Sequence, residues 1–131
     1  MKFASRVRSK QQTVGTGWKT LLTDDDGNPG WDLAGPVKFQ AQANVCVDGL
    51  AAGEVLVLRF FTLDNKGNQN QRAYNWPVIE LVGTAGSSNG SIVQYGSIGS
   101  RSGWNRWLRL EARTEQGSVT VTRLQTSTFS Q

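Results

Sequence analysis

Hydrophobic and polar residues alternate most clearly within Val37–Leu63, and the pattern predicts two neighbouring β-strands there. In Val37–Val47 every second residue is apolar, which indicates a strand with one face in a core and one polar face. In Val55–Leu63 both faces are apolar, and a strand of that kind needs cover on both sides. We therefore expect one face of this second strand to be the spare face that meets a neighbouring subunit. The residues on that spare face are Leu56, Leu58 and Phe60.

Turn-forming residues divide the rest of the chain into short segments with the composition of β-strands. Pro77 stands inside one of them and predicts an edge strand or a bulge, because proline cannot donate to a sheet. No helix of ordinary length is expected. About eight strands at this spacing predict an all-β, antiparallel, two-sheet sandwich. The further strands are expected at Trp18–Thr23, Arg72–Val82, Ser91–Tyr95, Trp104–Arg113, Ser118–Leu124 and Gln125–Ser130.

Composition agrees with a β-rich fold and limits the chemistry. The 131 residues correspond to one domain, and 18% charged residues with 15 glycines suit a sandwich with many turns. Cys46 is the only cysteine and histidine is absent, so neither an intrachain disulfide nor a Cys/His zinc site is expected. A lone cysteine fits a protein that folds in a reducing cytoplasm. No apolar run is long enough to span a membrane, and Met1–Lys10 is not a secretory signal.

The net charge of +4 comes from the N-terminal segment. Four of the 14 basic residues lie in Met1–Lys10, which leaves ten basic residues against ten acidic ones in the remaining chain. We therefore expect residues 1–15 to form a basic arm and residues 16–131 to form the sandwich domain. Such an arm suits an acidic protein surface, nucleic acid or lipid headgroups, although a frayed terminus has the same composition. The expected contact residues of the arm are Lys2, Phe3, Arg6, Arg8 and Lys10.

Catalysis has little support in the sequence. Without histidine there is no Ser/His or Cys/His pair, no two carboxylates are singled out, and no glycine-rich phosphate loop opens a helix. The acidic run Asp24–Asp26 lacks the spacing of an EF-hand and is expected to be a solvated turn, with a weak cation site as the alternative. We expect neither an enzyme nor a bound cofactor or metal.

Two groups of residues suggest binding chemistry. The tryptophans Trp31, Trp76 and Trp107 suggest glycan binding through ring stacking, with use in the core or an interface as the alternative. A second group suggests a strip for single-stranded nucleic acid, but interleaved Glu111 and Glu115 favour a set of ion pairs. That second group consists of Arg101, Arg106, Arg109 and Arg113 with Trp107.

Five segments carry a resemblance to a known fold family. They are Thr16–Leu21, Pro36–Val45, Gly49–Phe60, Leu108–Ala112 and Ser127–Ser130. Together they resemble the jelly-roll domain of tumour necrosis factor and the complement globular head, in the form found in bacteriophage virion proteins. The resemblance spans roughly Thr16–Ser130, and it implies a homotrimer in which the outer face of one sheet packs around the three-fold axis. The expected interface residues are Leu56, Leu58, Phe60, Trp107 and Phe129.

The resemblance also implies a role. No stalk precedes the domain, so a knob that sits directly on a larger assembly is favoured over a fibre tip. We expect a non-enzymatic virion protein, assembled in the host cytoplasm, that decorates the phage head by binding the major capsid protein and thereby stabilises the head. A tail fibre or receptor-binding component is the alternative in the same class, with host surface glycans as its ligands. A stand-alone carbohydrate-binding module is the alternative from another class, and a nucleic-acid-binding domain is a weaker one.

Overall fold

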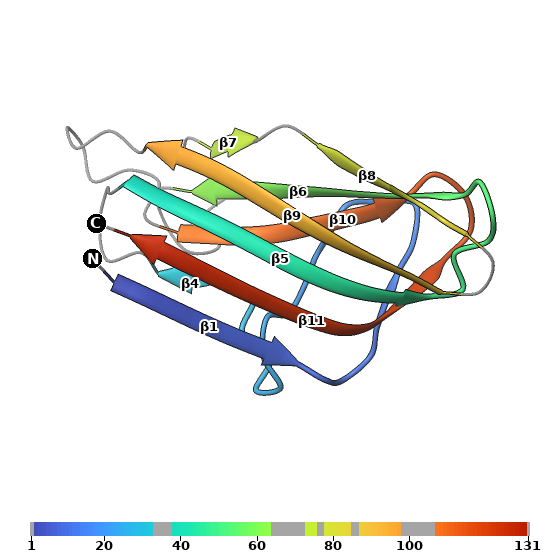
Figure 1. Ribbon diagram of the computed structural model, residues 1–131, viewed down its shortest axis with the longest axis horizontal. Coiled ribbons are helices and arrows are strands. Elements are labelled where there is room, and N and C mark those ends of the chain that lie inside the picture. The colour runs from blue at the N-terminus through green and yellow to red at the C-terminus, as the bar shows by residue number, and fades with distance from the viewer. Residues whose placement is uncertain are drawn as a thin grey trace.

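The computed structural model describes residues 2–32, 38–63, 73–75, 78–84, 87–97 and 107–130, and these residues form strands without any helix (Figure 1). The described residues thus contain no helix that is long and apolar enough to cross a membrane. The strands are β1 (Lys2–Arg8), β2 (Gln12–Val14), β3 (Lys19–Thr20), β4 (Trp31–Asp32), β5 (Lys38–Asp48), β6 (Val55–Leu63), β7 (Ala73–Asn75), β8 (Ile79–Val82), β9 (Ser87–Ser97), β10 (Trp107–Thr114) and β11 (Val119–Ser130).

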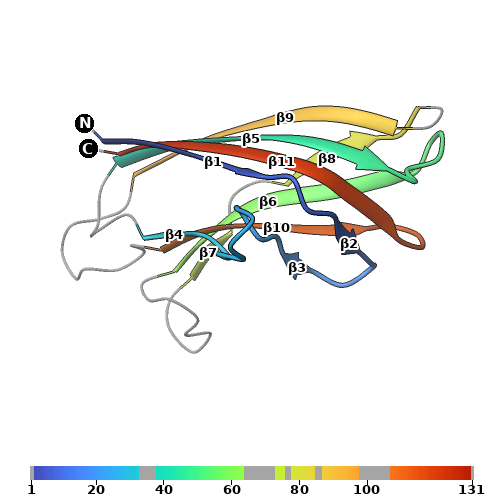
Figure 2. The same ribbon diagram turned by 90° about the horizontal axis from the view of Figure 1, so that it is seen from below.

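The strands form two antiparallel sheets that stack as two layers (Figure 2). The front sheet, nearest the viewer in Figure 1, has the order β1-β11-β5-β9, and β2 also pairs with β11. The back sheet has the order β3-β10-β6-β7, with β4 on β10 and β8 on β6. The prediction of an all-β, two-sheet antiparallel sandwich is thus confirmed.

The two strands of Val37–Leu63 lie in different sheets. β5 is in the front sheet and β6 is in the back sheet, so the chain crosses the sandwich between them. Gly49 and Gly53 have φ angles of 86° and 83° in this crossing, a region that glycine enters without steric cost. The alternation in β5 is confirmed, because its odd-numbered residues from Phe39 to Val47 are buried in the core.

The expected spare face of β6 is wrong. Leu56, Leu58 and Phe60 lie between the sheets in the core of this one chain, with 0%, 1% and 0% of their surface exposed. Their neighbours in the core come from the other strands, including Leu108 and Leu110 of β10 and Leu124 of β11. Since the single chain already covers them, they cannot also form a seam between subunits.

The N-terminal segment is not an extended arm. β1 pairs with β11 over its whole length, from Lys2 opposite Ser130 to Arg8 opposite Leu124. Alternate residues of β1 face outward, and the residues between them face the sandwich, so its arginines are directed toward the interior. The basic composition that suggested an arm therefore belongs to a strand with two inward-facing cations.

Three other boundaries differ from expectation. β9 begins at Ser87 and ends at Ser97, beyond both ends of the strand expected at Ser91–Tyr95, because residues on both sides of that segment also pair with β5. Val119–Ser130 is one continuous strand with a register shift between Val121 and Arg123. The strand expected at 72–82 is divided into β7 and β8, on either side of a segment that contains Pro77.

Candidate functional site

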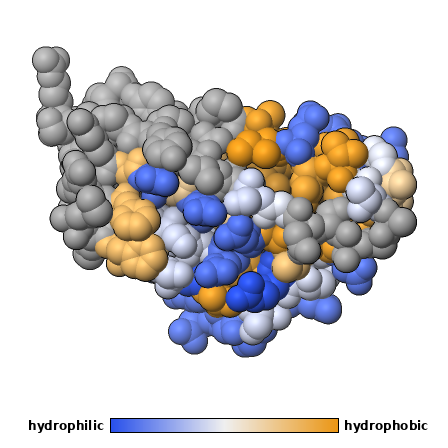
Figure 3. Space-filling model, viewed as in Figure 1, coloured by the Kyte–Doolittle hydropathy of each residue, from blue (hydrophilic) through white to orange (hydrophobic). Residues whose placement is uncertain are grey.

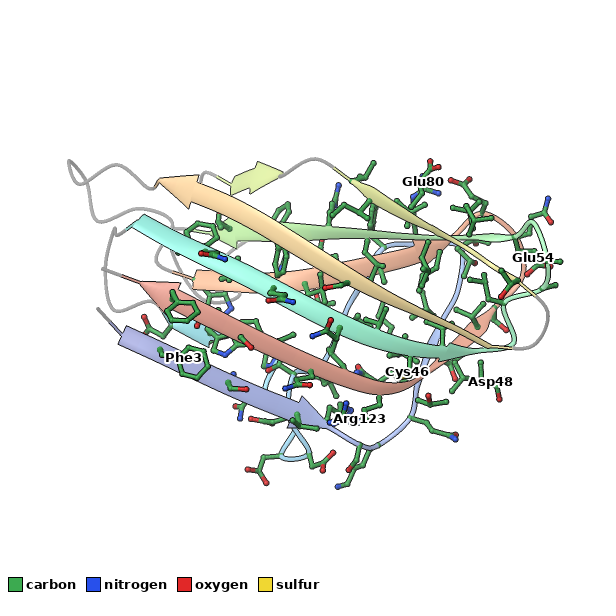
Figure 4. The ribbon with its side chains drawn as sticks, viewed as in Figure 1. Phe3, Cys46, Asp48, Glu54, Glu80 and Arg123 are labelled. Atoms are coloured by element: carbon green, nitrogen blue, oxygen red, sulfur yellow. The ribbon has the colours of Figure 1, made fainter. Side chains whose placement is uncertain are left out.

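On the outer face of the front sheet, strand pairing places residues in rows across the strands. One row is formed by Phe3, Phe129 and Gln40, the next by Ser5, Ser127 and Gln42, and the third by Val7, Gln125, Asn44 and Ser91. None of the side chains in these three rows is charged. Charged residues stand at both ends of the three rows: Lys38 begins β5 two residues before Gln40, and Arg123 beside Cys46, together with Asp48, follows the third row (Figure 4).

One end of this face is apolar. Phe3 and Phe129 are 58% and 40% exposed, and their ring centroids lie 4.8 Å apart at an interplanar angle of 49°. Val7, on the same edge of the sheet, is 40% exposed. In Figure 3, pale orange side chains mark the end of the face near the chain termini, and white and blue polar residues cover its middle. Aromatic pairs of this kind, rimmed by neutral polar residues, are typical of interaction surfaces.

The outer face of the back sheet has a different character, because a layer of arginines and aromatic rings covers it. The guanidinium of Arg59 lies 3.8 Å from the ring centroid of Trp18, and that of Arg113 lies 5.2 Å from the same ring. Arg109 packs over Phe61 at 4.8 Å. Val57, on the same face of β6, is only 2% exposed. The second apolar face of β6 is thus covered by side chains of its own chain.

Ion pairs hold this arginine layer together. The Arg59 Nη2 and Glu111 Oε1 atoms lie 2.8 Å apart, and the Nε of Arg59 donates to the same oxygen at 2.9 Å. Arg109 pairs with the other carboxylate oxygen of Glu111 at 3.4 Å, and Arg113 pairs with Glu115 at 3.4 Å. For Arg109 and Arg113 the ion-pair interpretation is confirmed. Arg101 and Arg106 lie outside the described residues.

The arginines expected to bind a partner are engaged inside the chain. Arg6 Nη1 donates to Thr23 Oγ1 at 3.1 Å and to the carbonyl oxygen of Gly30, and its guanidinium lies 5.2 Å from the Trp31 ring. Arg8 is 9% exposed and donates to the Asp24 carbonyl oxygen at 2.8 Å. Together they fasten the loop of residues 21–30 to β1.

Of the other expected arm residues, one is engaged and one is exposed. Lys10 Nζ donates to the Asp25 carbonyl oxygen at 3.2 Å, and the side chain of Lys2 is outside the description. Phe3 is exposed, but on the uncharged face of the front sheet. The five residues therefore do not form one basic contact surface.

The carboxylates of Asp24 and Asp25 accept hydrogen bonds from other groups of the same chain. The Asp24 carboxylate accepts hydrogen bonds from the Asn28 side chain at 2.6 Å and from two backbone N–H groups, and these bonds lower its pKa. The Asp25 carboxylate accepts from the Ser9 hydroxyl at 2.7 Å and from the N–H groups of Ser9 and Lys10, and these bonds lower its pKa. The described residues contain no group of three or more His, Cys, Asp or Glu side chains arranged for a metal ion. The solvated-turn interpretation is the one that the contacts support.

Of the three tryptophans considered for glycan binding, the two that the structure describes lie on opposite faces of the back sheet. Trp31 is 3% exposed in the core, and Trp76 lies outside the described residues. Trp107 is half-buried and pairs with Asp32 on the opposite face of the back sheet from Trp31. The assignment of Trp31 to a sugar site is therefore wrong, since a buried ring cannot stack on a ligand.

The remaining interface candidates, Trp107 and Phe129, lie in different sheets and do not share a surface. Sequence reasoning missed Phe3, Val7 and the neutral rows beside them as a surface. The alternation in Lys2–Arg8 could have predicted this surface, because its uncharged residues Phe3, Ser5 and Val7 alternate with alanine and arginine. The basic charge of the segment drew the interpretation to an arm instead. It also missed Trp18 and Arg59 as the cover of the back sheet.

A scan with protein-family models finds no match to this chain, and a search of curated proteins finds no significant similarity.

Proposed function

We propose that this chain is a non-enzymatic structural protein of a bacteriophage virion, a homotrimer with a jelly-roll fold that decorates the head and stabilises it. The strand order supports the jelly-roll part. β1 with β2, β3 with β4, and β7 with β8 each act as one interrupted strand, because both members pair with the same neighbour. When each of these pairs is counted as one strand, the order of the strands in the two sheets is the order that two Greek keys produce.

The observation that carries the oligomer is the outer face of the front sheet, with its three uncharged rows. The eleven paired residues of β5 and β9, from Lys38 to Asp48 on β5, extend about 36 Å, and four strands are roughly 19 Å wide, so the whole face, with the charged residues at its ends included, covers roughly 700 Å². That area is close to the roughly 800 Å² per partner of a stable interface. Its neutral centre, exposed aromatic pair and charged far end match the anatomy of an interface with a polar rim.

The support for the virion role is the resemblance of Thr16–Ser130 to jelly-roll domains of phage virion proteins, and not a side-chain contact within the structure. Because Arg6 and Arg8 hold a loop of the sandwich itself, the contact with the major capsid protein falls to an end of the trimer and not to a threading arm. A tail location belongs to the same class of protein, and the experiment below separates the two.

Light scattering of the purified protein tests the oligomer first, with three chains as the expected mass. The Phe3→Ser/Phe129→Ser variant should remain folded and become monomeric, because both rings lie on the proposed seam. Val82→Ser is the matched control: Val82 is 53% exposed, but on the back sheet, and its variant should remain trimeric. A wild-type chain that stays monomeric at every concentration would remove the proposal.

The location is tested by binding. Labelled wild-type protein is mixed with purified phage heads and, separately, with purified tails, and both are recovered by sedimentation. Sedimentation with heads, together with a higher temperature of head disruption, is the expected result. Sedimentation with tails alone would replace the decoration role by the tail role.

A further inference from the structure

The two edges of the front sheet differ in a way that bears on how copies associate. β9 is an edge strand of eleven residues without a charged residue or a proline, and no described strand pairs with its outer side. Natural edge strands are usually short, charged, bulged or covered, since an open edge invites pairing with another chain. The edge strands of the back sheet are two to four residues long. β9 is the described edge that lacks these protections.

The opposite edge carries the exposed apolar side chains. Phe3 and Val7 of β1 and Phe129 of β11 lie there, across the sheet from β9. Among the described residues, one edge thus offers an uncharged strand whose outer side no strand pairs with, and the other offers exposed apolar side chains. Both belong to the same sheet.

Three-fold symmetry makes contacts between two different patches, whereas a two-fold axis brings a patch onto itself. A rotation about an axis parallel to the strands preserves height along them. Residues in one row of the sheet, such as Val7 and Ser91, therefore meet at the same height in neighbouring copies.

We propose that β9 of one copy packs against β1 and β11 of the next, with Ser91 of one copy beside Val7 of its neighbour. The inference rests on the proposed trimer and specifies its contact. A two-fold contact of β9 with itself would leave Phe3, Val7 and Phe129 exposed, so it accounts for only one of the two edges. The occupant of both edges is thus a second copy of this chain.

Cross-linking tests the contact. In a Cys46→Ser background, the Val7→Cys/Ser91→Cys chain is treated with a bis-maleimide reagent much shorter than the separation of the two positions within one chain. That separation is about 14 Å across three strand spacings. We expect covalent dimers and trimers and nothing larger. The Val7→Cys/Val82→Cys chain is the control and should stay uncross-linked, because Val82 lies on the back sheet.

The outcomes separate the contact from the trimer. Val7→Cys alone and Ser91→Cys alone, each in the Cys46→Ser background, are treated with the same reagent. Covalent dimers of either chain would show that the same edge of two copies is in contact, and they would overturn the inference. A chain that has the mass of a trimer in light scattering but gives no cross-links would overturn the contact while leaving the proposed function intact. A chain with the mass of a monomer would remove both.

Discussion

Replacing Phe60 with alanine distinguishes a core residue from an interface residue. Phe60 is 0% exposed within the single chain and lies among the leucines of β10 and β6. A buried Phe→Ala change costs about 3–5 kcal/mol, from lost transfer free energy and from the cavity that remains. For a domain of this size, 4 kcal/mol lowers Tm by roughly 15 °C.

The measurement is thermal unfolding followed by circular dichroism, made in the Phe3→Ser/Phe129→Ser chain so that association does not contribute. If Phe60 belonged to a seam between copies, its replacement would leave this monomeric chain nearly as stable as before. Phe129→Ala, examined as a single change in the wild-type chain, should instead weaken association, because Phe129 is 40% exposed. A Phe60→Ala chain that unfolds within about 2 °C of its parent would refute the assignment of Phe60 to the core.

Three further predictions concern stability. Gly83→Ala should destabilise the fold by about 1–3 kcal/mol, because a Cβ there would lie 2.8 Å from the Leu50 carbonyl oxygen, whereas Gly15→Ala should be nearly neutral since nothing lies within 4 Å; chemical denaturation compares them. Glu111→Gln should cost roughly 2 kcal/mol because it leaves half-buried arginines without a counter-ion, and exposed Glu115→Gln should cost under about 0.5 kcal/mol in the same assay. The stability difference between wild type and Asp25→Asn should be complete above about pH 4 and diminish as the pH falls further, since hydrogen bonds from Ser9 lower the pKa of Asp25 in the folded chain; acid titration of unfolding measures it, and a difference that does not change between pH about 5 and pH about 2 would contradict it.

The sequence predicts a strand well where its composition favours a β-strand over a helix or a loop. β6 has the predicted bounds, Val55–Leu63, because β-branched and aromatic residues fill it and turn residues enclose it. The faces of β6 were not predictable in the same way. When both sides are apolar, periodicity carries no information on which side meets the other sheet. That choice was made by long-range packing, in which Trp18 and the arginine layer cover the valine face.

Charge misled the interpretation of the N-terminus for a related reason. From composition alone, Arg6 and Arg8 are expected to be solvated cations. In the structure their guanidinium groups donate to carbonyl oxygens of the loop of residues 21–30, and Arg6 also lies over the ring of Trp31 in β4. Arginine tolerates this position because its long apolar stem packs while its donors reach acceptors. The rows of the front sheet likewise depend on pairings between β1, β11 and β5, which no local pattern specifies.

The order of the front sheet has a consequence for how the chain acquires its fold during synthesis. Of the described strands, β11 is the last to leave the ribosome, yet it lies between β1 and β5 and pairs with both. Until residues 119–130 emerge, β1 lacks the only described strand with which it pairs, and this pairing closes a loop from Lys2 to Ser130. Contacts so distant in sequence slow folding and leave apolar strands exposed to other nascent chains. Deleting the last twelve strand residues should therefore not shorten the sandwich but prevent it from forming.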